Sequence, residues 1–344
     1  MKAFSGVGIR LGIDIGSSQI RIYSDNKIIL EEASCAAVNG NGMILGFGTD
    51  AIVRSHSPDQ KCHLEWTVKN GIMIDYEITK AMLRYFINKA IHHSVNRPTV
   101  MVSLPCEISS VVRHALVDAL VHAGAQHVFL ISAPAAAAVG SGVVPDLPGT
   151  VFSTVIGKDV TDCGIYCCGG VVQEKGISFG GRTIDEGICH FIQKKYNLTI
   201  GMDQAEKLKR EWVSVMHASR NESFTVRGRR LADGVEVIIE LTERTLSPVM
   251  QSILQPVVQL MKRVLRSATP EMAEDLIKSG MILAGGTAQL PGISDWISSQ
   301  IGIPVFVAED PEDVVAAGCY LSLNDIDRLP MIIESGKKYF GGAQ

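Results

Sequence analysis

This 344-residue sequence has no excess of basic charge and no uninterrupted apolar run of membrane-spanning length. Its 32 Lys and Arg residues oppose 36 Asp and Glu, for a formal net charge of −4 and no basic arm, so we expect no nucleic-acid partner. Residues 1–6 contain no long apolar segment, which predicts no secretory signal. The stretch 128–145 is interrupted by Ser132, Pro134 and Gly140, and therefore predicts a buried strand, a turn and a small-residue helix.

Metal-binding and nucleotide-binding signatures of the common kinds are also missing. The eight cysteines are scattered, and the C-x3-C-C run of Cys163, Cys167 and Cys168 has no zinc spacing. Reduced, buried thiols in a cytosolic protein are the expected state. No Walker A sequence is present. The chain is 46% apolar and 20% charged, an ordinary globular composition that excludes a disordered protein.

A strand–turn–strand pattern occurs twice in the sequence. The first copy runs from the apolar strand Val7–Ile15 through Gly16-Ser17-Ser18, and the second begins with the strand Thr150–Ile156. Alternating strands and helices follow each copy, and Asp14 aligns with Val155. A chain of this length suggests about two domains. The repeat therefore predicts two similar α/β domains that face each other, joined by the linker Pro145–Gly149.

Helix boundaries follow from capping residues and proline. We expect helices over Thr79–His93 and over Ser109–Ala123, with Ser109 as the N-cap. Pro291 and Pro311 predict two further helices with proline in the first turn, where its missing N–H costs nothing.

The turn after the first strand is a candidate phosphate loop. It contains Asp14, Gly16, Ser17, Ser18 and Gln19. Small residues allow backbone N–H groups to approach a phosphate, and hydroxyls add further donors. Asp14, at the strand end, could hold Mg²⁺ through a water molecule. The alternative is an ordinary tight hairpin with a solvated aspartate, which is the commoner meaning of this pattern taken alone.

Two further motifs could bind the rest of a nucleotide. Gly285, Gly286, Thr287 and Ala288 follow a predicted buried strand, where glycines allow a flat or charged group to come close. A strand–helix turn that needs positive φ is the alternative. Glu206-x-x-Lys209 places a carboxylate and an ammonium on one helix face, suited to ribose and phosphate. An exposed ion pair is the alternative, and taken alone it is the favoured one.

Several longer stretches of sequence point to one protein family. They are Gly12-Ile13-Asp14-Ile15-Gly16, Gly71-Ile72-Met73-Ile74-Asp75-Tyr76, Met82-Leu83-Arg84-Tyr85-Phe86-Ile87, Lys194-Lys195-Tyr196-Asn197-Leu198-x-Ile200-Gly201 with Ala205-Glu206, Gly285-Gly286, and Val307-Ala308-Glu309-Asp310-Pro311. In this order and at these separations they resemble the MreB/Mbl-like family of bacterial actins, within the actin-like ATPase superfamily. The resemblance covers nearly the whole chain, without a large insertion or an extra domain.

The resemblance implies an actin-like fold, with two similar α/β domains around a nucleotide cleft and a smaller subdomain on each. The implied boundaries are subdomain IA at 1–32, 71–147 and 315–344; IB at 33–70; IIA at 148–182 and 243–314; and IIB at 183–242. ATP would bind in the cleft with Mg²⁺. Asp14, Gly16, Ser17, Ser18 and Gln19 would face the phosphates, and Gly157 and Lys158 would form the second phosphate loop. The ribose and adenine would contact Glu206, Lys209, Gly285, Gly286, Thr287 and Ala288.

The resemblance also implies partners and a location. The protein would assemble head to tail with itself into filaments, as an open heterologous assembly requires. It would be cytoplasmic and peripheral at the inner face of the cell membrane, where filaments of this family organise wall synthesis and cell shape. Other bacterial actin paralogues and membrane-bound cell-wall machinery are the further partners implied. Residues Met1–Phe4 are too short for a strong interfacial helix, so membrane attachment would need many subunits acting together.

The sequence departs from the family pattern at positions that matter for hydrolysis. The second loop, D-x-G-G-G-T-T-E in the family, opens here with Val155 and has Lys158 and Asp159 in place of glycines. The water-positioning Glu of the family corresponds to Ala133, and the Asp expected after Gly180-Gly181 is Arg182. We therefore expect no intact catalytic residue at Ala133 or Val155, and impaired ATP hydrolysis. Two alternatives stay open: an active ATPase that uses Asp14 with Asp159 or Asp162, and a nucleotide-independent adaptor that co-assembles with another bacterial actin.

Overall fold

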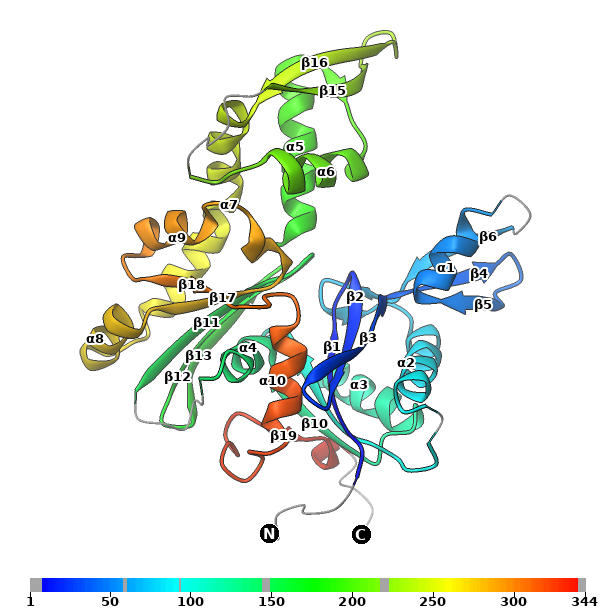
Figure 1. Ribbon diagram of the computed structural model, residues 1–344, viewed down its shortest axis with the longest axis vertical. Coiled ribbons are helices and arrows are strands. Elements are labelled where there is room, and N and C mark those ends of the chain that lie inside the picture. Colours follow the sequence, from blue (N-terminus) through cyan, green and yellow to red (C-terminus); the bar gives the residue numbers. More distant parts are fainter. Residues whose placement is uncertain (1–7, 58–60, 93, 144–148, 217–222, 340–344) are drawn as a thin grey trace.

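The protein consists of two α/β halves, each built on a buried sheet (Figure 1). The computed structural model describes residues 8–57, 61–92, 94–143, 149–216 and 223–339. The expected linker 145–149 and the segment Met1–Phe4 lie outside these residues, apart from Gly149. Along the described chain, no helix combines the length and the apolar character that crossing a membrane requires.

The first half is organised around a six-stranded sheet with the order β19-β10-β9-β1-β2-β3. Its strands are β1 (Arg10–Ile15), β2 (Gln19–Ser24), β3 (Lys27–Ala33), β9 (Thr99–Leu104), β10 (His127–Ser132) and β19 (Glu334–Ser335). Helices α2 (Tyr76–Ala90) and α3 (Ser110–His122) pack on it through a core that includes Leu11, Phe86 and Leu120. The Ser109 side chain accepts from the N–H of Val112, which confirms the predicted N-cap.

The second half has a five-stranded sheet with the order β13-β12-β11-β17-β18. Its strands are β11 (Thr150–Ile156), β12 (Thr161–Cys167), β13 (Gly170–Ile177), β17 (Met281–Ala284) and β18 (Val305–Val307). The helices of this half are α5 (Gly181–Tyr196), α7 (Glu243–Leu265), α8 (Pro270–Ser279) and α9 (Ile293–Ile301), with the 3-10 helix η1 (Gly286–Gln289) after β17. Buried side chains such as Ile188, Leu254 and Ile297 join these elements in one core.

The same hairpin occurs at the start of both sheets. In β1–β2, the N–H of Gly16 donates to the carbonyl of Gln19 at 3.0 Å, and in β11–β12 the N–H of Gly157 donates to Val160 at 2.9 Å. Asp14 lies opposite Arg21 in the first hairpin, and Val155 lies opposite Asp162 in the second. Position by position, Val155 thus stands where the first hairpin has Asp14.

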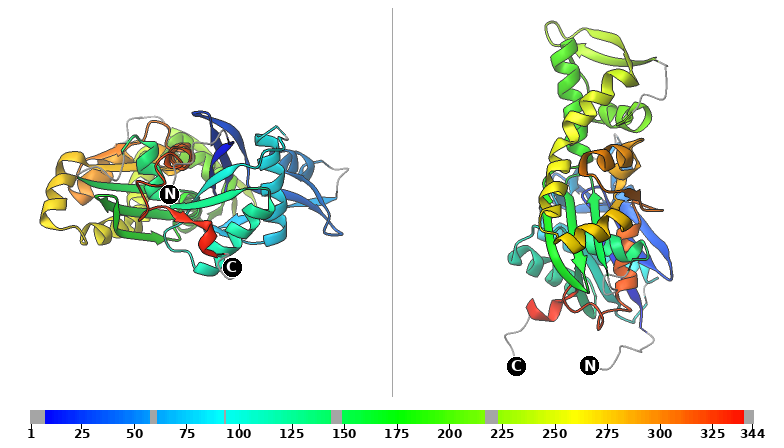
Figure 2. Two further views of the ribbon diagram at one scale, coloured as in Figure 1. Left: turned by 90° about the horizontal axis from the view of Figure 1, so that it is seen from below. Right: turned by 90° about the vertical axis from the view of Figure 1, so that its left-hand side faces the viewer.

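Each half carries a smaller unit, the first at the right and the second at the top of Figure 1, with two further views in Figure 2. The first unit comprises β4 (Cys35–Asn39), β5 (Ile44–Phe47), α1 (Gly48–Ser55) and β6 (Cys62–Trp66), beside the short pair β7 (Val68–Lys69) and β8 (Ile72–Met73). The second comprises β14 (Leu198–Thr199), α6 (Met202–Trp212), β15 (Ser223–Arg230) and β16 (Glu236–Thr242). The four subdomain boundaries given above stay a prediction.

Two helices rich in small residues cross between the sheets. They are α4 (Ala133–Gly140) and α10 (Val314–Ser322), which follow β10 and β18 in the chain. A Cβ added to Gly318 would overlap the carbonyl of Ala136, and one added to Gly140 would overlap the carbonyl of Val314. The crossing therefore depends on glycine, because only the absence of a side chain lets the two backbones approach so closely.

Three predicted helix starts were wrong by a few residues. The helices expected from Pro291 and Pro311 begin at Ile293 and Val314, because Gly292 at φ 75° and a turn from Asp310 to Asp313 separate each proline from its helix. The helix expected from Thr79 begins at Tyr76, because the side chain of Asp75 caps the N–H of Ile78.

Candidate functional site

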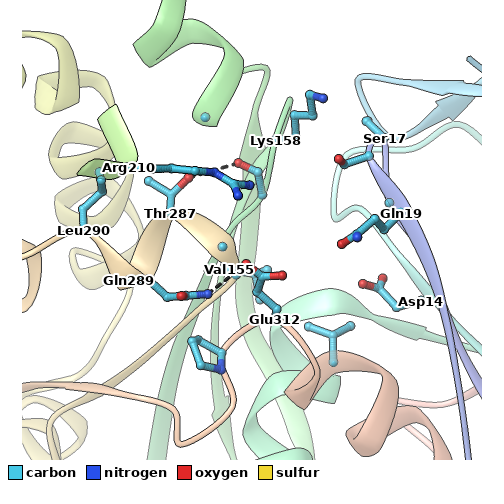
Figure 3. A pocket seen from close by; sticks show the side chains of 18 of the residues that line it. Asp14, Ser17, Gln19, Val155, Lys158, Arg210, Thr287, Gln289, Leu290 and Glu312 are labelled. Carbon is cyan, nitrogen blue, oxygen red and sulfur yellow. Dashed lines mark hydrogen bonds between the residues drawn. The ribbon is translucent and has the colours of Figure 1, made fainter. Parts of the chain in front are cut away.

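A cavity of about 380 Å³ opens between the two halves. Its walls contain every predicted nucleotide-binding residue except Ala288: Asp14, Gly16, Ser17, Ser18, Gln19, Gly157, Lys158, Glu206, Lys209, Gly285, Gly286 and Thr287. Ala288 is 2% exposed and packs into the core of the second half. Figure 3 shows Asp14, Ser17 and Gln19 on one wall, facing Thr287 and Gln289 on the other. The volume is within the range of small-molecule sites.

The end of β1 places Asp14 on the wall of the cavity. Its carboxylate accepts a hydrogen bond from the Ser103 hydroxyl at 2.6 Å, across neighbouring parallel strands. Burial raises the pKa of Asp14, and the hydrogen bond from Ser103 and the charge of Arg21 oppose that rise only in part. A divalent cation nearby would favour the ionised form. Asp14 thus suits the predicted role of holding a hydrated cation.

The glycines after β17 bring two chain segments together. Gly285 adopts φ 87°, and a Cβ there would overlap the backbone of Ile156 on the neighbouring strand β11. Thr287 then donates from its hydroxyl to the carbonyl of Gly157 at 3.4 Å. Glycine is therefore required at Gly285 for backbone conformation and for close approach, and this turn is built directly against the second loop.

The helix α6 contributes Glu206 and Lys209 to the cavity wall. The Lys209 ammonium forms a buried ion pair with Asp185 at 2.8 Å and donates to the carbonyl of Gly181 at 3.1 Å. Glu206 pairs with Arg210 at 3.3 Å, on a side where the Arg210 side chain is 71% exposed. Lys209 therefore fixes α6 to the start of α5, and a ligand would meet an ammonium whose charge is already paired.

The second loop makes contacts across the cleft. The Lys158 ammonium lies 5.0 Å from the centre of the Trp66 ring, which belongs to the small unit of the first half. Asp159 accepts from Arg182 at 2.7 Å and from the N–H of Asn70 at 3.2 Å. Burial of Asp159 favours the neutral acid, but the hydrogen bonds from Arg182, Asn70 and Ser17 outweigh it and lower its pKa. The loop thus links the halves through charged groups.

The alternative metal ligands Asp159 and Asp162 do not line the cavity. Asp159 is 4% exposed and paired with Arg182, while Asp162 accepts from the N–H of Cys106 at 2.9 Å. Burial raises the pKa of Asp162 to about 7. Neither carboxylate therefore joins Asp14 in holding a cation. In the part of the chain that the structure describes, no three His, Cys, Asp or Glu side chains form a metal-binding group.

Sequence reasoning missed a polar network on the cavity wall. Arg21 donates to Gln19 at 2.6 Å and to Glu312 at 2.5 Å, and Glu312 accepts from Gln289 at 2.8 Å. Arg21 also pairs with Asp313. The cross-strand position of Arg21 opposite Asp14 could have indicated it, since β2 returns beside β1. No sequence pattern indicated the contact between Glu312 and Gln289, because the two residues are distant in the chain and come together only when it folds.

The two expected catalytic positions carry no titratable group. Val155 lines the cavity, whereas Ala133 begins α4 and is absent from the cavity wall. The serine before it, Ser132, donates to Glu174, which also accepts from the Tyr166 hydroxyl at 2.7 Å. Ser132 and Glu174 line a separate groove.

Two α/β halves that begin with the same hairpin, with both hairpin loops facing one cleft, define an actin-like protein. Solved structures agree in fold. MreB5 of Spiroplasma citri bound to AMPPNP has a TM-score of 0.85 and 22% identity, covering 94% of this chain and 98% of its own. The MamK double helical filament has a TM-score of 0.74 and 17% identity, covering 92% and 98%.

Sequence comparison gives the family. The family profile described as MreB/Mbl protein matches residues 8–331. The cell shape-determining protein Mbl of Bacillus subtilis is 32% identical over 324 residues, or 93% of this chain and 97% of that protein. The cell shape-determining protein MreB of Escherichia coli K12 is 32% identical over 341 residues, covering 95% and 97%. The chain belongs to the MreB/Mbl family, as its motifs predicted.

Proposed function

We propose that this chain binds ATP in the cleft and assembles head to tail into cytoskeletal filaments that help determine cell shape. The observation that carries the proposal is the meeting of two hairpin loops, around Gly16 and Gly157, over one cavity, with the hydroxyls of Ser17 and Ser18 on the first loop. Four basic side chains also line it: Lys158, and Arg21, Lys209 and Arg210, which are paired with carboxylates. Backbone N–H groups and cations are the donors that phosphate groups require.

Magnesium fits this site less fully than phosphate does. Asp14 is the carboxylate beside the first loop, and Val155 occupies the equivalent position in the second hairpin. A cation would be held by Asp14 through water and by the phosphates themselves. Lys158 lies on the same wall and can supply part of the missing charge. We expect ATP binding to depend less on Mg²⁺ than a site with two carboxylates would require.

Hydrolysis is proposed to be slow. In-line attack on a γ-phosphate needs a positioned water and a compensated charge, and misplacing one such group costs a few orders of magnitude in rate. Ala133 has no polar group to orient a water, and Val155 has no charge to support a cation. The protein would therefore keep ATP bound for long times.

Assembly and location rest on the relatives. Their names record cell-shape determination, and MamK is described as a double helical filament. We propose that this chain forms filaments with itself, and with bacterial actin paralogues where they are present. The proposed place is the cytoplasmic face of the cell membrane, in contact with membrane-bound cell-wall machinery.

Two measurements test the proposal. Sedimentation with and without ATP should show more polymer with ATP, and equal pelleting in both would favour a nucleotide-independent adaptor. Phosphate release should be slow in the natural protein and should rise in Ala133→Glu with Val155→Asp. The matched control, Ala133→Gln with Val155→Asn, has similar shapes without the charges and should stay slow. Natural turnover as fast as that of the charged variant would contradict impaired hydrolysis.

A further inference from the structure

Two adjacent thiols lie at the turn between β12 and β13. Cys167 ends β12, Cys168 follows in the turn, and their Sγ atoms are 3.7 Å apart. Cys168 is exposed and Cys167 is half-buried, and both are free thiols. No other two cysteines of the sequence are neighbours in the chain. The pair therefore combines mutual contact with access from solvent, which reversible thiol chemistry requires.

The backbone makes cysteine an unusual choice at this turn. Cys167 pairs with Gly170, and the two residues between them, Cys168 and Gly169, adopt φ 50° and φ 75°. Both are left-handed, which corresponds to a two-residue type I′ hairpin turn that favours Asn, Asp or Gly at its first position. The left-handed conformation at position 168 does not favour cysteine. A residue that local conformation does not explain points to a role for its side chain.

A conformational change in the turn would affect residues that lie next to it. Gly170 faces the same side of the hairpin as Cys167, because directly paired residues share a face. A Cβ on Gly170 would lie 3.6 Å from the methyl group of Met331, which belongs to the segment before β19 of the first half. Cys167 also lies opposite Thr150, whose hydroxyl donates to Asp275 of α8 at 3.2 Å. The turn thus lies next to a segment of the first half.

We propose that Cys167 and Cys168 form a reversible oxidation site at which a hydroperoxide converts the two thiols into a vicinal disulfide. The Cys168 thiolate attacks the peroxide oxygen, the O–O bond breaks, and Cys168 becomes a sulfenic acid while the peroxide is reduced to water or an alcohol. Cys167 sulfur then attacks Cys168 sulfur. The S–O bond breaks, and hydroxide leaves with the thiol proton as water. Two thiols lose two electrons and the peroxide gains them.

The disulfide would be easily reversed. Neighbouring Cα atoms across a trans peptide are about 3.8 Å apart, below the roughly 4.4–6.8 Å that disulfides normally span. The sulfurs must also approach from 3.7 Å to about 2.05 Å. The bond therefore forms under strain, and strained disulfides are the ones that small thiols reduce readily. Formation must rearrange the Cys168–Gly169 turn, next to which Met331 lies.

The test uses the full-length protein and hydrogen peroxide. One equivalent of peroxide should remove two hydrogen masses from the intact protein, and a dithiol reductant should restore them. A peptide containing Cys167 and Cys168 should then resist alkylation until it is reduced. Phenylarsine oxide, which bonds to two thiols with loss of water, should bind in one equivalent to the reduced protein and compete with oxidation.

Three variants make the result decisive. Cys167→Ser and Cys168→Asn should each abolish the mass loss and the arsenical binding, and Asn suits the left-handed turn, so folding should be kept. Cys62→Ser, at a half-buried cysteine on β6, is the matched control and should oxidise as the natural protein does. Oxygen addition without hydrogen loss, disulfide-linked dimers, or equal oxidation in Cys168→Asn would each overturn the proposal.

Discussion

Replacing Lys158 by methionine separates two roles that its ammonium can have in the cleft. The ammonium lies 5.0 Å from the Trp66 ring centre. A hydrogen bond to a charged phosphate contributes about 1.5–3 kcal/mol, and a cation–π contact at such a site about 0.5–1 kcal/mol. Since ATP must draw Lys158 away from Trp66, the net loss in Lys158→Met should be about 1–2 kcal/mol, or roughly 5- to 30-fold weaker ATP binding.

Replacing Trp66 should have the opposite effect on ATP affinity. Trp66→Leu removes the competing contact and leaves Lys158 free, so ATP should bind roughly two- to fivefold more tightly. Trp66 is one of three tryptophans, so its emission can be obtained as the difference between the natural protein and Trp66→Leu. In the natural protein ATP should change that emission as the ammonium leaves the ring. In Lys158→Met the change should be lost.

Affinity is measured by equilibrium dialysis with labelled ATP, with Lys158→Arg as the control that keeps the charge. Equal affinity of Lys158→Met and the natural protein would refute phosphate binding by Lys158. Weakening in Trp66→Leu as large as in Lys158→Met would refute the competition, and would mean that the contact acts by holding the cleft closed.

Three further outcomes are expected. Burial raises the pKa of Asp162 from 3.8 to about 7, so its stabilisation is complete below about pH 4 and is lost as the pH rises through 7. Asp162→Asn, which can still accept from Cys106, should make the free energy of unfolding less dependent on pH over that range. An unchanged dependence on pH in denaturant titrations would contradict this. Gly318→Ala forces a methyl group into the Ala136 carbonyl and should lower stability by about 3 kcal/mol or more, whereas Gly40→Ala, in open space, should cost under about 1 kcal/mol, and equal losses would refute the close helix crossing. Monomer should bind anionic liposomes poorly and polymer better; equal binding by an assembly-blocked variant would defeat the role of many weak contacts.

Local sequence signals predicted the parts of the fold that local chemistry determines. The hairpin around Gly16, the repeat at Gly157 and the strand before Gly285 follow from apolar strands that end in small residues. The cap at Ser109 follows from its side chain and the apolar run after it. These features depend on residues close in the chain, so their positions could be placed from the sequence.

Contacts between distant segments could not be placed in this way. Arg21 meets Glu312, Lys158 meets Trp66, and Lys209 pairs with Asp185. Each contact joins segments whose meeting depends on how the two halves pack. The predicted helix starts at Pro291 and Pro311 were wrong for a related reason. The carbonyl of Pro291 accepts from the N–H of Val215 and that of Pro311 from the N–H of Gly285, and a turn separates each proline from its helix.

The departures from the family pattern are related to one another in the structure. The motif pattern predicts a glycine at the position of Asp159 and an acid at that of Arg182, and here the two side chains form an ion pair at 2.7 Å. An acid at position 182 would face the buried carboxylate of Asp159, and like charges at that distance are unfavourable. A glycine at position 159 would leave Arg182 without its partner and free the N–H of Asn70. Each change therefore makes the other favourable. Lys158 on Trp66, and Asp159 with the N–H of Asn70, make this a loop whose side chains span the cleft, where the motif pattern predicts glycines.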